Sequence, residues 1–202
     1  ANFGSIYEFP SREFPLGTDQ LGRDVLSRMI YGARVSMLVG LGSQIIVVLL
    51  GVPLGAIAGY VGGRTDILMT RFIDVMYAFP QLLFVILLMS MLGAGLINIF
   101  IALGLTGWVG IARQTRAQVL ALKEKEFVEG ARALGARGWR VLTRHILPSA
   151  LTPIVVSVTF GIPQAIFTEA ALSFIGVGIN PPTPSWGQMV GENQQFLRSY
   201  WY

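Results

Sequence analysis

Few residues of this 202-residue sequence could do chemistry, and most of the basic ones lie in one segment. Eight of the 15 Lys and Arg residues fall within residues 113–144. No Gly-x4-Gly-Lys-[Ser/Thr] stretch is present to hold nucleotide phosphates, and no Ser-His-Asp or paired-carboxylate arrangement is evident. His145 is the only histidine and cysteine is absent, so no metal site is expected. We therefore expect no catalytic residue, and an intramembrane enzyme is disfavoured.

Composition indicates a multi-pass membrane protein. The sequence is 53% hydrophobic and 13% charged, whereas soluble domains carry about 25% charged residues. A helix of about 20 apolar residues crosses the hydrocarbon core of a bilayer, and the backbone of each span must satisfy its own hydrogen bonds. We predict an all-α membrane protein with four transmembrane helices. The predicted spans are residues 37–60, 73–92, 97–111 and 150–175.

The predicted spans divide the chain into three parts. Residues 1–36 are interpreted as an extracytoplasmic or interfacial amphipathic segment, in which Asp19 caps a short helix over residues 21–31. Residues 37–175 form the transmembrane domain, and residues 176–202 form an irregular tail rich in Pro and Gly. The chain begins at Ala1 without an initiator methionine or a signal-peptide pattern, which is compatible with a piece of a longer protein.

Glycine and proline positions predict how the spans pack and bend. Gly51, Gly55 and Gly59 are four residues apart, a spacing that suits close helix contacts in lipid, either within the chain or with another subunit. Pro80 should kink or start a helix. The same expectation holds for Pro53, Pro153 and Pro163.

The distribution of basic residues sets the expected orientation. With four crossings, the turn at 60–72 and the loop at 112–148 lie on one side and hold ten Lys and Arg residues. The opposite side holds five. Short loops rich in Lys and Arg stay in the cytoplasm, so we expect the 112–148 loop there and both chain ends outside.

The basic loop reads as two helices joined at Gly135. Phe127, Ala131 and Leu134 share one face of the first helix, and Gly135 stands where a helix ends in a left-handed residue. The second helix should bring Trp139, Leu142 and Ile146 together. A rigid hairpin of this kind could lie on lipid head groups or dock into a groove of a cytoplasmic partner, and the residues alone leave both open.

The loop resembles the EAA loop of permease subunits in bacterial ABC importers. That pattern is Glu-Ala-Ala, three residues, Gly, nine residues, Ile, one residue, Leu-Pro, and five residues match it: Glu129, Ala131, Gly135, Leu147 and Pro148. Gly130 replaces an alanine, and His145 stands at the isoleucine position with Ile146 one residue later. The stretches "LGTDQLGRDVLSRMIYGARVSM", "EAALSFIGVG" and "PPTPSWGQM" are similar to the C-type permease of the dipeptide/oligopeptide/nickel branch.

The resemblance implies a type I ABC importer permease in the bacterial inner membrane. Family members have six spans, so this four-span chain resembles one without its first and last helices. The expected partners are a second homologous permease in a heterodimer, an extracytoplasmic substrate-binding protein, lipid, and two cytoplasmic ATPases that bind ATP and Mg; no cofactor in this chain and no nucleic acid are expected. The residues implied to couple to the ATPases are Glu129, Gly130, Ala131, Gly135, Ile146, Leu147 and Pro148.

Other positions have a structural and a functional interpretation. Glu169 lies inside the fourth span, either as a gate or pathway residue or as a hydrogen-bonding link to a neighbouring helix. Pro182, Ser185 and Trp186 are candidates for contact with the binding protein or for a periplasmic lid, and the alternative is an interfacial anchor. Di- or oligopeptides are the expected substrate, with nickel or another small solute as the alternative. A secondary transporter and a non-transporting scaffold are the rival classes.

Overall fold

The computed structural model describes residues 6–196, and regular structure in this part of the chain is helical. An isolated bridge between Thr18 and Asp24 closes a loop before the first helix. The α-helices are α1 (Val25–Val61), α2 (Gly63–Ala78), α3 (Gln81–Leu92), α4 (Leu96–Leu122), α5 (Glu126–Ala133), α6 (Gly138–Val141), α7 (Leu147–Phe174) and α8 (Trp186–Asn193). A π-helical turn, η1 (Leu142–Ile146), joins α6 to α7, and a 3-10 turn, η2 (Gln194–Phe196), follows α8.

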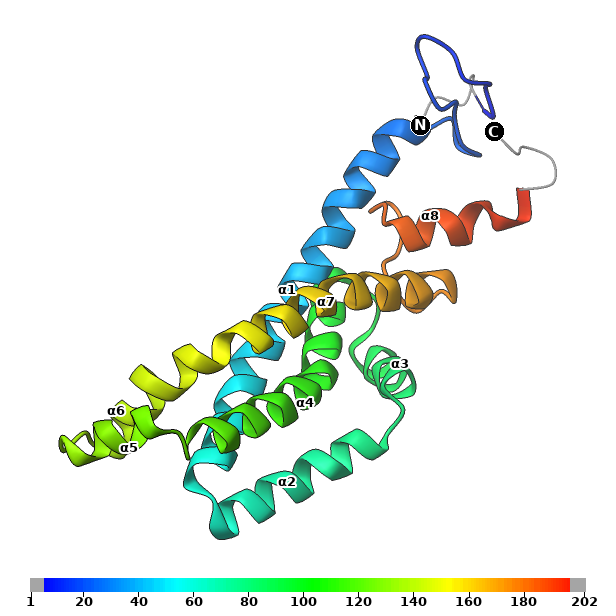
Figure 1. The fold of residues 1–202 in the computed structure, drawn as a ribbon. Coiled ribbons are helices and arrows are strands. Elements are labelled where there is room, and N and C mark those ends of the chain that lie inside the picture. Colours follow the sequence, from blue (N-terminus) through cyan, green and yellow to red (C-terminus); the bar gives the residue numbers. More distant parts are fainter. Residues whose placement is uncertain (1–5, 197–202) are drawn as a thin grey trace.

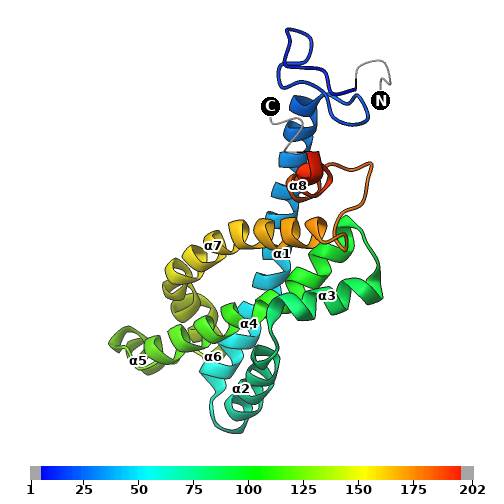
Figure 2. The same cartoon turned by 90° about the vertical axis from the view of Figure 1, so that its right-hand side faces the viewer.

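The molecule is elongated along α1, with different elements at its two ends (Figure 1). α8 and the loop before α1 lie at one end, whereas α5, α6 and the start of α2 lie at the other. The view turned by 90° shows the same separation (Figure 2). The basic loop therefore lies at the opposite end of the molecule from the loop before α1 and from α8, as the predicted four crossings require.

The closest helix contact joins α1 to α4 through the glycines of α1. A Cβ atom at Gly51 or at Gly59 would lie 2.8 Å from the backbone oxygen of Trp108 or Arg116 respectively. A Cβ at Gly55 would overlap the backbone oxygen of Ala112. The four-residue spacing therefore gives α1 a groove along its length that seats α4, so these glycines pack within this chain.

Among residues 6–196, three helical stretches are long and apolar enough to cross a membrane: α1, α4 and the continuous stretch Gly138–Phe174. α2 and α3 pass the same test only as a pair, and they are bent by 84° at their junction. The predicted span over residues 73–92 is therefore broken at Pro80, where a kink or a helix start was expected, and α2 and α3 make a fourth span only when they are taken together. Pro80 lacks an amide hydrogen and restricts Phe79 to an extended conformation, so α2 ends at Ala78 and α3 begins at Gln81.

Several predicted boundaries also change. Asp24, and not Asp19, caps the first helix by accepting hydrogen bonds from the amides of Leu26 and Ser27, and the helix continues unbroken into the first span. The expected polar turn after Tyr60 is already helical from Gly63. The third span does not end at residue 111, because α4 continues to Leu122. The tail is not wholly irregular, since α8 forms within it.

Replacing Gly55 should separate α1 from α4. We expect Gly55→Leu to lower the free energy of unfolding by about 2 kcal/mol, because the added side chain overlaps the α4 backbone. Thermal unfolding of the detergent-solubilised protein measures this change. Gly130→Ala is the control, since a Cβ at Gly130 meets nothing within 4 Å. Equal stability of both variants would show that the glycine contact does not hold the two helices.

Candidate functional site

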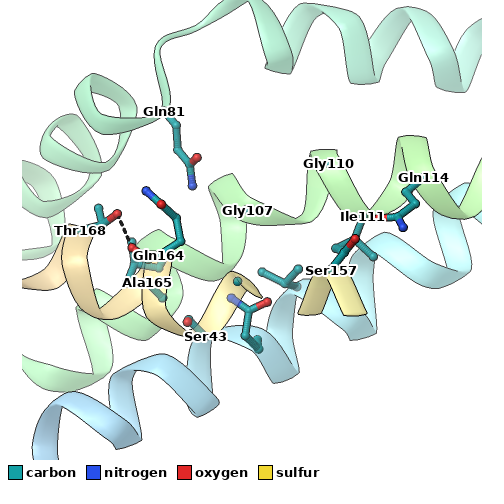
Figure 3. Close-up of a pocket in the computed structure, with 14 residues that line it drawn as sticks. Ser43, Gln81, Gly107, Gly110, Ile111, Gln114, Ser157, Gln164, Ala165 and Thr168 are labelled. Atoms are coloured by element: carbon teal, nitrogen blue, oxygen red, sulfur yellow. Dashed lines mark hydrogen bonds between the residues drawn. The ribbon is translucent and has the colours of Figure 1, made fainter. Parts of the chain in front are cut away.

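A cavity of about 330 Å³ lies between α1, α3, α4 and α7 (Figure 3). Its polar lining consists of amides and hydroxyls and includes no charged side chain. The polar side chains that line it are Ser43, Gln44, Gln81, Gln114, Ser157, Gln164 and Thr168. Because Gln81 and Gln164 are exposed, the cavity is open on the side of α3 and α7. Its volume is in the range of small-ligand sites, which is about 300–1,000 Å³.

Sequence reasoning did not single out these glutamines. The available signal was uncharged polar residues inside otherwise apolar spans, which is where Gln44 and Gln164 stand. The span at 150–175 by itself carries several uncharged polar residues, and some of them, such as Thr152 and Thr159, do not line the cavity. Only the packing of α1, α3, α4 and α7 brings them to one cavity, so the sequence pattern of a single helix could not reveal the site.

The basic hairpin (residues 126–146) is anchored to the ends of α1 and α4. Val128 and Val141 are fully buried and pack in one cluster with Ala56 of α1 and Val119 of α4. Gly138 lies against the ring of Tyr60, close enough that a Cβ there would be 3.2 Å from the phenolic oxygen. The hairpin is folded into two short helices, as predicted, and its buried residues attach it to the spans.

The outer surface of the hairpin carries large apolar side chains. Leu134 is 91% exposed, Trp139 is 71% exposed, and Phe127 is also exposed. Val128 is the buried residue of α5, whereas Phe127 and Leu134 of the predicted face are exposed. The predicted grouping of Trp139 with Leu142 and Ile146 does not hold, because Trp139 is exposed and the other two are buried.

The backbone of the hairpin agrees with two further predictions. Gly135 has φ +81°, the left-handed conformation expected at the join of α5 and α6. Pro148 lies in the first turn of α7, as expected for a proline that begins a helix. Before it, the Leu147 amide donates to the Leu142 carbonyl five residues back, which defines the wider η1 turn. Ile146 is fully buried, although it stands one residue after the family position.

The remaining EAA-loop residues occupy different environments. Glu129 and Gly130 are exposed on α5, and Ala131 is half-buried against the cluster that anchors the hairpin. Leu147 is half-buried and Pro148 is exposed. Glu129 and Gly130 thus lie on the free side of the hairpin, whereas Ala131, Ile146 and Leu147 contribute to its attachment.

Glu169 is fully buried where α1 approaches α7. Its carboxylate accepts hydrogen bonds from the hydroxyls of Ser173, at 2.7 Å, and of Ser36 on α1, at 3.4 Å. Ser36 also accepts from the amide of Trp186, at 3.4 Å. Glu169 is thus a link between three segments and does not line the cavity, although its neighbour Thr168 does. Its role as a gate stays a prediction.

The three candidate residues between α7 and α8, Pro182, Ser185 and Trp186, occupy different environments. Ser185 is buried and caps α8 by accepting from the Gln188 amide. Trp186 donates from Nε1 to the Met29 carbonyl of α1, at 3.1 Å, with 42% of its surface exposed. Pro182 is exposed. The loop is thus fastened to α1 through Trp186, and Pro182 is the candidate that a partner could reach.

A second buried polar group, which the sequence did not predict, joins the loop before α1 to α8. Arg28 donates to Asp19, at 2.6 Å, and to Glu192, at 2.8 Å. Arg23 donates to the same two carboxylates. Burial by itself raises the pKa of Asp19, but hydrogen bonds from the backbone amides of Arg23 and Leu21 and from the Arg23 side chain outweigh it and lower that pKa.

Within residues 6–196, no group of three or more His, Asp and Glu residues is placed to hold a metal ion.

Residues 51–201 match the family described as "Binding-protein-dependent transport system inner membrane component". The chain is 46% identical over 194 residues to the dipeptide transport system permease protein DppC of Bacillus subtilis (strain 168), covering 96% of this chain and 61% of that protein. It is 46% identical over 191 residues to the oligopeptide transport system permease protein OppC of the same strain, covering 95% and 63%.

The chain is also similar in sequence to a third permease and in fold to a solved transporter structure. The glutathione transport system permease protein GsiD of Pectobacterium atrosepticum is 39% identical over 191 residues, with coverage of 95% of this chain and 64% of that protein. The chain thus spans less than two thirds of the length of these relatives. An inward-facing structure of the MetNI methionine ABC transporter superposes with a TM-score of 0.67 at 17% identity, covering 86% of this chain and 83% of that one. This likeness establishes a shared fold.

Acid should weaken the contact between the loop before α1 and α8. The pKa of Asp19 lies below its usual value of 3.8 in the folded protein, so its stabilisation is complete above that value and is lost as the pH falls through the lower, folded pKa. We expect the unfolding temperature to fall between about pH 5 and pH 3, and Asp19→Asn to reduce this dependence. Thermal unfolding at several pH values measures it. Glu13→Gln, at an exposed position, is the control; identical pH profiles for wild type and Asp19→Asn would contradict the assignment.

Proposed function

Because the chain belongs to the family of binding-protein-dependent transport system inner membrane components, we propose that it is a permease subunit of an ATP-driven importer of di- or oligopeptides. The observation that carries this proposal is structural. α1 and α4 wall the uncharged polar cavity near their middle and anchor the basic hairpin at their ends. A movement of the hairpin is therefore transmitted to the cavity wall through two packed helices.

The hairpin is the proposed contact with the cytoplasmic ATPases, which bind the ATP and Mg. Docking into a protein groove needs an uncovered apolar surface, and Leu134 and Trp139 provide one. Glu129 and Gly130 lie on the same free side and would contribute polar and close backbone contacts. A lipid surface would bury the same apolar residues, so a test of docking must distinguish contact with an ATPase from contact with lipid.

A second, homologous permease is the proposed partner within the membrane. Only 17% of the apolar stretch of the Gly138–Phe174 span is buried inside this chain. The uncovered side chains on α7 include Leu151, Val155, Phe160 and Phe167. Since the cavity opens toward α3 and α7, a second permease placed there would close it and complete a pathway between the two chains.

Glu169 remains the proposed gate residue. Its hydrogen bonds connect α7 to α1 and, through Ser36, to the start of α8. Any movement of α7 relative to α1 must exchange these bonds, so the carboxylate couples the periplasmic end to the spans. Pro182 at the exposed loop is the proposed contact for a substrate-binding protein.

The substrate is inferred from two sources. Relatives at 46% identity are named for dipeptide and oligopeptide transport. Amide and hydroxyl side chains complement the donors and acceptors of a peptide backbone, and such side chains make up the polar lining of the cavity. Nickel or another small solute remains the alternative within the same role.

Crosslinking tests the docking role of the hairpin. The chain contains no cysteine, so Leu134→Cys creates one reactive thiol at the most exposed large apolar residue of the hairpin. In inside-out vesicles containing the assembled importer, we expect crosslinks to a single-cysteine ATPase whose yield changes when ATP binds. Gln194→Cys, at the opposite end, is the control and should give none. Efficient insertion without any ATPase crosslink would return the hairpin to a lipid-surface role and favour a scaffold or secondary transporter.

Coupling should depend on the left-handed turn at Gly135. Proline cannot adopt φ +81°, whereas asparagine tolerates it. A side chain at this position meets nothing within 4 Å, so only the backbone is tested. We expect Gly135→Pro to insert normally but to lose substrate-stimulated ATP hydrolysis, and Gly135→Asn to keep it. Normal stimulated hydrolysis in Gly135→Pro would refute a rigid coupling turn.

A further inference from the structure

Three glutamines on different helices reach the cavity without a partner of their own. Gln44 comes from α1, Gln81 from α3 and Gln164 from α7. Within residues 6–196, no hydrogen bond engages their side-chain amides, in contrast to Gln114, which donates from Nε2 to the Pro153 carbonyl at 2.9 Å. Gln114 thus ties α4 to α7, whereas the other three amides are free to bind a molecule in the cavity.

We propose, on the basis of the proposed function, that Gln44, Gln81 and Gln164 are substrate-binding residues that hydrogen-bond to the backbone amides of the transported peptide. A side-chain amide offers two donor hydrogens and one acceptor oxygen, the same groups that a peptide bond presents in complementary form. Recognition of the backbone alone makes binding independent of the substrate's side chains. The absence of fixed charge from the cavity wall then allows peptides of either charge to pass.

Gln44 is buried, whereas Gln81 and Gln164 are exposed. Gln44 is only 9% exposed, so most of its side chain is shielded by the surrounding helices, and it lines the cavity. Space for its amide comes from Gly161 on α7, where a Cβ would lie 2.5 Å from the Gln44 Oε1 atom. α7 thus lacks a side chain where the amide of α1 needs room beside the cavity.

Gln81 stands between this cavity and a second one. Both cavities are lined by Gln81, Gly107 and Gly110, and the second, of about 420 Å³, extends toward Tyr77 and Phe84 at the break between α2 and α3. Figure 3 shows Gln81 and Gln164 reaching from separate helices into the space beside α4. Substrate moving from one cavity to the other would pass Gln81 and the two glycines opposite it.

Electrostatics explains why an uncharged wall matters. A charge in a cavity of low dielectric attracts substrates of opposite sign and repels those of like sign much more strongly than it would in water. Amide dipoles can reorient toward either sign at little cost. Replacing one of these glutamines by glutamate should therefore make the rate of transport depend on the charge of the peptide. The same replacement at a residue with a purely structural role would not produce this change.

The test is uptake of charge-matched peptides by the assembled importer in vesicles, with its second permease, ATPases and binding protein. We expect wild type to transport a lysine-containing and a glutamate-containing tripeptide at comparable rates. In Gln81→Glu and Gln164→Glu, the ratio of anionic to cationic uptake should fall by about tenfold. Gln194→Glu adds the same charge outside the cavity and should leave the ratio unchanged. Unchanged ratios in both cavity variants would overturn the proposal.

A second measurement keeps the test independent of folding. Gln164→Cys, the only cysteine of its chain, is labelled after assembly with neutral, cationic or anionic thiol reagents. We expect the anionic label to favour uptake of the cationic peptide and the cationic label to favour uptake of the anionic peptide. Gln194→Cys is the control and should show no such preference. The same uptake ratio with both labels at position 164 would count against the proposal. Failure of the wild type to accumulate any peptide with ATP would instead refute the proposed function, so the two failures are distinguishable.

Discussion

Close contact between α1 and α4 is the constraint on which the rest of the structure depends. Three glycines spaced by four residues let the backbone of α4 approach α1 without an intervening side chain. Lipid provides no hydrophobic force to drive such an approach, so the gain comes from dispersion contacts over a long, matched surface. Both helices then act as one stiff frame. The cavity is built against its middle, and the hairpin is attached to one of its ends.

A stiff frame of this kind explains why the other parts are hinged or separable. α2 and α3 meet at Pro80 with an 84° bend, and they contact the frame less extensively than α1 and α4 contact each other. α7 buries little of its surface in this chain and carries both Gln164 and Glu169. Two of the glutamines that line the cavity, Gln81 on α3 and Gln164 on α7, and the buried link at Glu169 therefore lie on elements outside the α1–α4 pair.

Much of this arrangement could be predicted from the sequence because it depends on local rules. Apolar length predicted the spans, the glycine spacing predicted their close packing, and Gly135 and Pro148 predicted the turns of the hairpin. Long-range pairings carry no such signal. Asp19 was predicted as a helix cap, yet its carboxylate pairs with Arg28 and, through that side chain, joins Glu192, more than 160 residues away. Likewise, nothing in Gln44 or Gln164 alone indicates that they line one cavity.

The hairpin shows how a local rule can be correct and still place residues wrongly. Helical periodicity put Phe127, Ala131 and Leu134 on one face of the first helix, but it does not decide which face is buried. Burial is decided by the helices beneath, which accept Val128 and Val141 instead. The row left outside includes Leu134 and, with Trp139, forms an apolar surface that water disfavours. A protein groove that covers this surface would gain free energy from its burial, and the rigid attachment would pass the resulting force to the helices around the cavity.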